Sequence, residues 1–265
     1  MTQFNHLSGN CFRIGDASLY FEIQGNPEGA PLVLLHGGLG NLADFNPILD
    51  KLPQHFRFIG IDFRGHGKST LGSAPLTYQQ YQTDLASILD HLGIDSCALL
   101  GISDGGIVAY RIAVQMPERV ASIITVGAQW KLEAGSPAFE MLRGLTAEMW
   151  VSMFPDSVSY YGAVNPTPDF NALVQAVVSL WIDQTQTGYP NTSVANIAAP
   201  SLIIRGDADP LFSLSEAAEL CAMVEGANFF NVPFCGHEAH MEAPDLFLAA
   251  VNEFLRQPRK LQHED

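Results

Sequence analysis

Residues 97–106, CALLGISDGG, carry the strongest structural signal in the chain. The first six residues form a nearly continuous apolar run, which is typical of a strand covered on both faces of a parallel sheet. An apolar helical pattern over residues 106–116 follows at once. A serine between such a strand and helix sits on a sharp, strained turn that accepts only small residues two positions before and after it. Because Gly101 and Gly105 meet that requirement, Ser103 is predicted to be an exposed nucleophile.

The same alternation of apolar runs and amphipathic helical patterns extends along the chain in both directions from this turn. Strands are predicted at 31–36, 56–62, 97–102, 120–126, 201–205 and 227–232, after an N-terminal hairpin with arms at 11–14 and 18–23. Helices are predicted at 78–92, 106–116, 213–224 and 244–255. This order favours an α/β fold with a doubly wound, mostly parallel eight-stranded sheet flanked by helices.

The alternation is interrupted once, from about residue 131 to residue 198. This segment has no strong strand pattern, but it has helical stretches at 138–154 and 169–183, with prolines and glycines between them. It is far too long for a connecting loop, so we expect a helical insertion that packs on the sheet. The expected domains are a core of residues 1–130 and 199–265 and an inserted helical cap of residues 131–198.

The bulk composition is that of a globular protein with an acidic surface. Of 265 residues, 47% are hydrophobic and 15% charged, and the formal net charge is −15. Such a charge repels phosphate backbones and anionic lipids, so neither nucleic acid nor a membrane surface is an expected partner. The four cysteines show no metal-binding spacing and are expected to be buried or partly buried thiols. Without a secretory signal or a long apolar run, the chain is expected to be cytoplasmic; a homo-oligomer is left open.

A nucleophilic serine needs an oxyanion hole, which is formed by one backbone N–H after the serine and another from a loop after an earlier strand. The sequence HGGLG, residues 36–40, directly follows the strand predicted at 31–36. The expected donors are the N–H groups of Asp104 and Gly38, with Leu39 as the alternative to Gly38. His36 itself is interpreted as a structural residue.

An acid and a histidine should follow the last two strands of the sheet. Asp209 in GDADP, residues 206–210, is the favoured acid, and Asp207 is its rival. His237 is the favoured base, with His240 as the alternative. The order Ser103, Asp209, His237 is that of a serine hydrolase whose nucleophile lies on a strand–helix turn. A metal site is not expected because the histidine pair lacks the spacing of a zinc motif, and no cofactor is predicted.

Taken together, these motifs resemble the α/β-hydrolase superfamily over residues 31–255. HGG, the segment DFRGHGKS at 62–69, the turn around Ser103, GDAD and GHEAHMEAP stand in the family's order. The resemblance implies a helical cap after the sixth strand and suggests that Asp62 and Arg64 form a bracing pair. A serine nucleophile, in place of aspartate, argues against the haloalkane dehalogenase and epoxide hydrolase branches. More weakly, the chain resembles the valacyclovir-hydrolase-like and enol-lactonase-like branches.

The predicted activity is hydrolysis of a small carboxylic ester or related acyl compound through a Ser-His-Asp triad and an acyl-enzyme. Enol-lactone hydrolysis, C–C bond hydrolysis and perhydrolysis would use the same triad, and a small-molecule receptor on this fold is the non-enzymatic alternative. Asp104 is either a favourable charge in the first turn of a helix or a group that attracts a cationic substrate. The residues expected to line the substrate pocket are Leu39, Trp130, Trp150, Phe154 and Trp181.

Overall fold

The structure, a computed structural model, describes residues 3–257 and contains one eight-stranded sheet with the strand order β1-β2-β4-β3-β5-β6-β7-β8. The strands are β1 (Asn10–Ile14), β2 (Ala17–Gly25), β3 (Pro31–Leu35), β4 (Arg57–Ile61), β5 (Cys97–Ile102), β6 (Val120–Val126), β7 (Ser201–Gly206) and β8 (Asn228–Val232). The β1–β2 and β2–β4 pairs are antiparallel, and the other pairs are parallel. The predicted fold class, an eight-stranded and mostly parallel α/β sheet, is confirmed.

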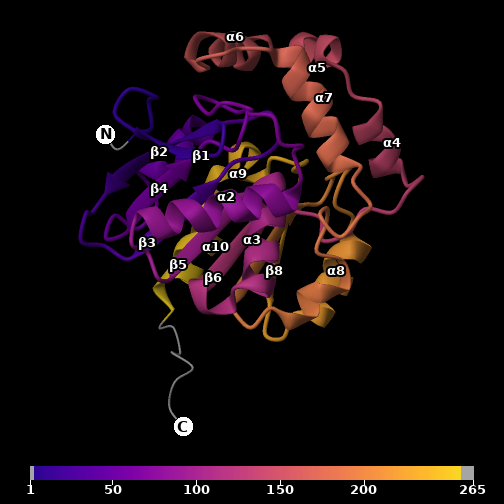
Figure 1. Cartoon of the computed structure of the whole chain (residues 1–265). Helices are drawn as coiled ribbons and strands as arrows, with labels where there is room; N and C mark the ends of the chain where they lie inside the picture. Colours follow the sequence, from indigo (N-terminus) through magenta and orange to yellow (C-terminus); the bar gives the residue numbers. More distant parts are fainter. Residues whose placement is uncertain (1–2, 258–265) are drawn as a thin grey trace.

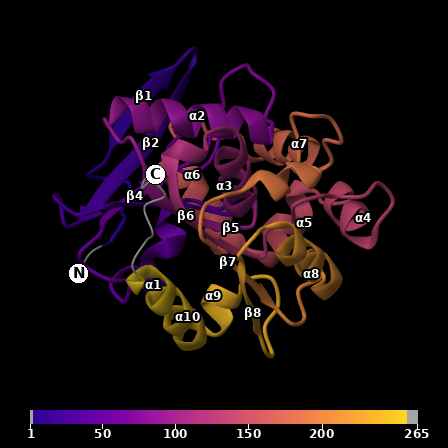
Figure 2. The same cartoon turned by 90° about the horizontal axis from the view of Figure 1, so that it is seen from below.

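Helices cover both faces of this sheet (Figures 1 and 2). On one face lie α2 (Tyr78–His91), α3 (Asp104–Gln115) and α8 (Leu214–Met223). On the other lie α1 (Asn46–Leu49), α9 (Ala239–Glu242) and α10 (Pro244–Arg256). Three short 3₁₀ turns are η1 (Leu42–Phe45), η2 (Pro117–Arg119) and η3 (Asn191–Asn196). The sheet is therefore a central layer between two helical layers.

Strand β5 shows how the sequence builds this arrangement. All six of its residues are buried, as expected for a central strand of a parallel sheet. Successive side chains point to opposite faces, so Leu99 packs in the cluster under α2 and α3, while Leu100 packs in the cluster under α10. The central strand is therefore packed on both faces. Because Ser103 directly follows β5, its backbone is held in a fixed position.

Four helices form the insertion that follows β6, and they gather at one end of the sheet (Figure 1). They are α4 (Pro137–Arg143), α5 (Ala147–Met153), α6 (Pro155–Val164) and α7 (Phe170–Trp181). The single helix predicted over 138–154 is two helices, because Gly144 ends α4 and the Thr146 side chain caps α5. Helix α6 was not predicted; it begins at Pro155, where proline is well accommodated in a first helical turn.

The exposure of the four cysteines differs in part from the expectation. Cys97 and Cys235 are buried and Cys221 is partly buried, whereas Cys11 is exposed because it lies on β1, the outermost strand of the sheet. The expectation that all four thiols are at least partly buried is therefore wrong for Cys11.

Over residues 3–257, none of the helices combines the length and the apolar character that crossing a membrane requires.

Candidate active site

The turn that carries Ser103 has the strained backbone predicted for it. Ser103 has φ 49° and ψ −115°, and its N–H donates a 2.7 Å hydrogen bond to the Val126 carbonyl of the neighbouring strand. A side chain at Gly105 would clash with the Leu35 carbonyl, and one at Gly101 would clash with the backbone of Gly105. Strand, turn and helix are thus packed too closely for any larger residue, and the hydroxyl of Ser103 is held at the carboxyl end of the sheet.

A chain of hydrogen bonds joins Ser103 to the loops after β7 and β8. The Ser103 hydroxyl Oγ lies 3.0 Å from Nε2 of His237. Nδ1 of His237 lies 3.0 Å from each carboxylate oxygen of Asp209, whose side chain is fully buried. Oδ1 of Asp209 also accepts the N–H groups of Leu211 and Phe212, which fixes the carboxylate. In this arrangement Nδ1–H donates to Asp209, and Nε2 is left to accept the proton of Ser103.

The local charges favour the protonated form of His237. Burial opposes the cation, but the hydrogen bond and the charge of Asp209, together with the charges of Glu238 and Asp104, outweigh it. The pKa of His237 is therefore raised above its ordinary value. A histidine of raised pKa binds a proton more strongly, which suits a group that must take the hydroxyl proton of serine.

The two rival residues lie apart from this chain. Asp207 is exposed, and its Oδ1 accepts the N–H of Cys235, so it braces the loop after β8 and makes no contact with His237. His240 is buried on α9 with its ring 6.1 Å from that of Phe247. Burial lowers the pKa of His240 to about 4. Neither rival is placed to exchange a proton with Ser103.

Two backbone N–H groups beside Ser103 are available to a ligand. Within residues 3–257 neither the N–H of Asp104 nor that of Gly38 donates a hydrogen bond. The glycine loop lies against the serine, because a side chain at Gly37 would be 3.5 Å from Cβ of Ser103. The N–H of Leu39, the alternative donor, is already engaged with Nε2 of His66 at 3.0 Å. Gly38 and Asp104 therefore match the requirements of an oxyanion hole.

Asp104 is buried and fully engaged with protein donors. Its Oδ1 accepts the hydroxyl of Tyr78 at 2.9 Å, and both carboxylate oxygens lie within 3.0 Å of Nε1 of Trp181, the last residue of α7. Burial is the main reason that the pKa of Asp104 is raised to about 6, although both hydrogen bonds oppose the shift. A side chain at Gly38 would clash with Trp181, so this indole covers the glycine loop. Asp104 thus ties the cap to the residue beside Ser103.

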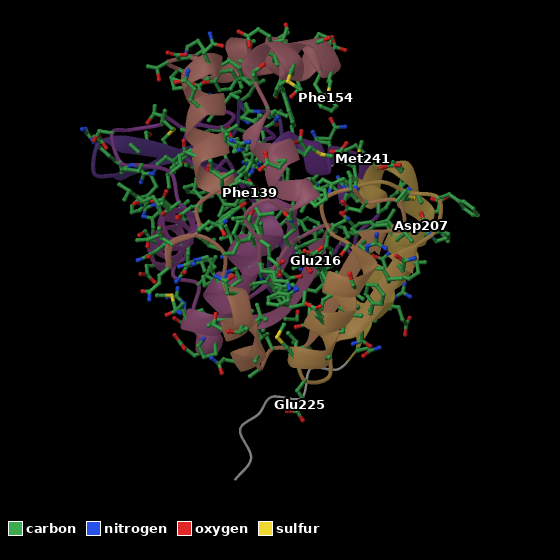
Figure 3. All side chains as sticks on the ribbon, turned by 90° about the vertical axis from the view of Figure 1, so that its right-hand side faces the viewer. Phe139, Phe154, Asp207, Glu216, Glu225 and Met241 are labelled. Carbon is green, nitrogen blue, oxygen red and sulfur yellow. The ribbon has the colours of Figure 1, made fainter. Side chains whose placement is uncertain are left out.

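The other residues expected to line the pocket have different surroundings. Leu39 is buried in the core, and Trp130 packs under Lys131 while its Nε1 donates to the Glu216 carbonyl on α8. Trp150 packs against Phe154, with ring centroids 4.7 Å apart. Phe154 is 42% exposed and lies at the outer part of the cap, on the side of the molecule where Figure 3 also labels Met241 of α9. Of the predicted set, Trp181 is the side chain in contact with Asp104.

The expected bracing pair of Asp62 and Arg64 does not form. Arg64 instead makes a double hydrogen bond with Asp84 of α2, at 2.9 and 2.7 Å. Asp62 pairs with His6 at 2.8 Å and also accepts the N–H groups of Leu42 and Lys68. Asp62 and Arg64 therefore each bind a different segment of the chain.

Two residues close to the site were missed in the sequence. Tyr78 supplies the hydroxyl that holds Asp104, and nothing in its helical pattern distinguishes it from a core tyrosine. Gly127, with φ 59°, lies against the histidine, since a side chain there would be 2.9 Å from Nδ1 and Cε1 of His237. Gly127 directly follows the strand predicted at 120–126, and this position was the sequence feature that could have indicated its place near the site. Over residues 3–257, no three histidine, cysteine, aspartate or glutamate side chains converge as metal ligands.

Comparison with known proteins agrees with this fold. The model of the alpha/beta hydrolase family matches residues 32–250, so the chain belongs to that family. It is 26% identical over 259 residues to 3-oxoadipate enol-lactonase 1 of Acinetobacter baylyi, covering 90% of this chain and 93% of that protein. It is also 26% identical to 2-hydroxy-6-oxo-2,4-heptadienoate hydrolase of Pseudomonas putida, covering 86% of this chain and 89% of that protein.

Among solved structures, the fold is shared with a hydrolase from Pseudomonas aeruginosa, with a TM-score of 0.79 and 23% identity over 96% of this chain and all of that one. A thermophilic esterase from Thermogutta terrifontis matches with a TM-score of 0.75 and 23% identity over 94% of this chain and 98% of that one. At these identities the likeness establishes the fold alone.

Proposed function

We propose that this protein is a serine hydrolase that cleaves a small carboxylic ester through an acyl-enzyme on Ser103. The observation that carries the proposal is the unbroken hydrogen-bond chain from Ser103 through His237 to Asp209, with distances of 3.0 Å. A structural serine has no need of a histidine oriented by a buried carboxylate. The N–H groups of Gly38 and Asp104, which have no partner among residues 3–257, support the same function because they can hold a negatively charged oxygen.

The chemistry follows from these positions. Nε2 of His237 takes the hydroxyl proton as Oγ of Ser103 bonds to the carbonyl carbon, and the resulting oxyanion accepts the N–H groups of Gly38 and Asp104. When the tetrahedral intermediate collapses, the C–O bond to the leaving alcohol breaks and His237 returns the proton to that oxygen. Water then attacks the acyl-enzyme with His237 again as base, which releases the acid and restores Ser103.

The relatives widen the range of substrates to be tested. Their names include an enol-lactonase and a hydrolase of a 2-hydroxy-6-oxo-dienoate, at 26% identity each. Both of these reactions, and perhydrolysis, need the same triad of Ser103, His237 and Asp209. The triad therefore does not determine which acyl compound is bound; the residues around it do. Because Asp104 is buried and held by Tyr78 and Trp181, the structure offers no support for its use as a receptor for a cationic substrate.

Labelling with a fluorophosphonate probe tests the proposal. The wild-type protein is expected to be labelled stoichiometrically, because only a serine activated by a general base attacks phosphorus rapidly. Ser103→Ala should take up no label, while Ser87→Ala, which removes a partly buried serine hydroxyl that donates to the Thr83 carbonyl of its own helix, serves as the matched control and should be labelled like wild type. Mass spectrometry of the intact protein gives the stoichiometry. An unlabelled wild-type protein would favour a small-molecule receptor over an enzyme.

Activity across a panel identifies the substrate class. Simple acyl esters, an enol lactone, a C–C-cleavage substrate, and an α-amino ester with its uncharged analogue are compared by kcat/KM. The highest value is expected for a small neutral ester. Similar kcat/KM values for the amino ester and its uncharged analogue would agree with a carboxylate of Asp104 that is already bound by Tyr78 and Trp181. A strong preference for the amino ester would contradict this role of Asp104.

The pH dependence of kcat/KM should report the titration of His237 in the free enzyme. His237 must be neutral to accept the serine proton, and its pKa is raised, so activity should rise with pH through a midpoint above the ordinary histidine value of about 6.5. Initial rates with an uncharged ester, over a pH range in which wild-type thermal stability is unchanged, measure this. A midpoint below the ordinary value would contradict the dominance of Asp209 in setting this pKa.

A further inference from the structure

Two buried histidines connect the loop that carries Gly38 to the loop after β4. We call residues 36–41 the β3 loop and residues 62–69 the β4 loop. His36 of the β3 loop accepts the N–H of Phe63 at 2.9 Å, and His66 of the β4 loop accepts the N–H of Leu39 at 3.0 Å, each through Nε2. The two rings lie 5.1 Å apart. Each loop therefore supplies a side chain that binds the backbone of the other.

The second nitrogen of each ring fixes its protonation state. Nδ1 of His36 lies 2.7 Å from the Gly37 carbonyl, and Nδ1 of His66 lies 3.0 Å from the Arg64 carbonyl. A carbonyl can only accept a hydrogen bond, so Nδ1 carries the hydrogen in both rings. A backbone N–H can only donate, so Nε2 must keep its lone pair. Both histidines are thus required to be neutral Nδ1–H tautomers, because a cation has no lone pair for Leu39 or Phe63.

The surroundings of both rings keep them neutral. His36 and His66 are 0% and 1% exposed, and burial is the main cause that lowers both pKa values, that of His66 to about 4. The ionisable groups that face the pair are each other and Tyr81, whose ring lies 6.2 Å from His66, while the charge of His6 further disfavours the cation of His36. For His66, the hydrogen bond to the Arg64 carbonyl favours the cation, but burial outweighs it.

The hydrogen bond to His66 determines which backbone N–H of the β3 loop is available to a substrate. Leu39 has φ 60°, a left-handed conformation that is strained for a residue with a side chain. Its N–H is turned to His66, while the preceding N–H, that of Gly38, has no partner within residues 3–257. We propose that His66 is a positioning residue for the oxyanion hole, which holds Leu39 in this conformation so that the Gly38 N–H is free for the substrate oxygen. The inference rests on the proposed hydrolase function.

Long-range ¹H–¹⁵N correlation spectra of the histidine rings test the arrangement without an activity assay. In the wild-type protein the His36 and His66 signals, assigned by their loss in His36→Gln and His66→Gln, should show the pattern of a protonated Nδ1 and an unprotonated Nε2. This pattern should persist to low pH, as far as the protein stays folded. Signals from Nε2–H tautomers or from imidazolium rings near neutral pH would overturn the proposal, because neither form can accept the Leu39 N–H.

A pair of substitutions then measures the effect on the reaction. His66→Leu fills the same space but offers no acceptor, and it should lower kcat about 100-fold with KM changed less than about threefold, as for the loss of one oxyanion donor. His66→Gln places a carbonyl oxygen near the position of Nε2 and should recover at least about tenfold of that loss. Equal kcat values for the two variants, or an unchanged kcat in His66→Leu, would refute the positioning role.

A control separates positioning from general destabilisation. Val120→Ala removes buried volume at the amino end of β6, opposite to the active site, and should lower Tm while leaving kcat unchanged. A drop in kcat in Val120→Ala similar to that in His66→Leu would show that kcat follows stability, which would contradict the proposal. If the wild-type protein cleaves no ester and takes no label, the hydrolase function fails; the ring spectra still decide whether the histidine pair exists.

Discussion

Asp209→Asn is expected to lower kcat about 10⁴-fold while the protein remains folded. The physical reason is the bonding of the carboxylate. Oδ1 accepts the N–H groups of Leu211 and Phe212, and an asparagine keeps these bonds by placing its carbonyl oxygen there. Its amide nitrogen then takes the place of Oδ2, which lies 3.0 Å from Nδ1 of His237. Because that nitrogen only donates, the ring adopts the Nε2–H tautomer and can no longer accept the proton of Ser103.

The matched control is Asp207→Asn, two residues earlier in the same loop. Asp207 is exposed, and within residues 3–257 its side chain accepts only the N–H of Cys235, which an asparagine can also do, so kcat should stay within about twofold of wild type. Both variants should show near-native Tm before their kinetics are compared. A larger loss in Asp207→Asn than in Asp209→Asn would reverse the assignment of the acid.

Arg64→Leu should destabilise the fold by about 3–5 kcal/mol, the largest stability effect that we expect from a single substitution outside the active site. Arg64 and Asp84 are almost fully buried, with side chains 2% and 4% exposed, and they form a double hydrogen bond. Removal of the guanidinium leaves the Asp84 carboxylate in the core with the Gln80 amide as its remaining side-chain donor. Urea unfolding followed by circular dichroism measures the change.

The double variant Arg64→Leu/Asp84→Leu shows whether the uncompensated charge causes this loss. Removing both partners eliminates the buried charge, so the double variant should be more stable than Arg64→Leu alone. Arg143→Leu, which breaks a pair with Glu140 in which both side chains are about half exposed, is the surface comparison and should cost less than about 1 kcal/mol. If Arg64→Leu costs no more than this surface variant, the buried pair contributes little to the fold.

The sequence was sufficient for the sheet and for the three residues of the hydrogen-bond chain at the site. Ser103, Asp209 and His237 each directly follow a strand or its short loop, and parallel strands bring their carboxyl ends to one edge of the sheet. The strand runs of β3 to β7 are almost purely apolar, so their positions were clear from periodicity. The parallel direction of these strands therefore places three residues far apart in the chain close together, without any detail of side-chain packing.

Contacts between segments that share no pattern could not be predicted in this way. His6 lies in an irregular N-terminal segment, and its pairing with Asp62 depends on how that segment crosses the sheet. The partner of Arg64 is Asp84 on α2, and the sequence contains several acidic residues at suitable distances from Arg64 along the chain. The division of the cap at Gly144 depends on a single residue at the end of α4, and α6 begins at Pro155 without a side-chain cap; a helical pattern over a long window resolves neither.

The indole of Trp181 has a consequence for protein engineering. Because this last residue of α7 donates to Asp104 beside the nucleophile, the insertion after β6 cannot be exchanged as an independent module. A chimera that grafts a cap from a relative onto this core must bring an indole or another donor to the same place, or replace Asp104 by a neutral residue. Otherwise the graft leaves a buried carboxylate with only Tyr78 to satisfy it, directly next to the reacting serine.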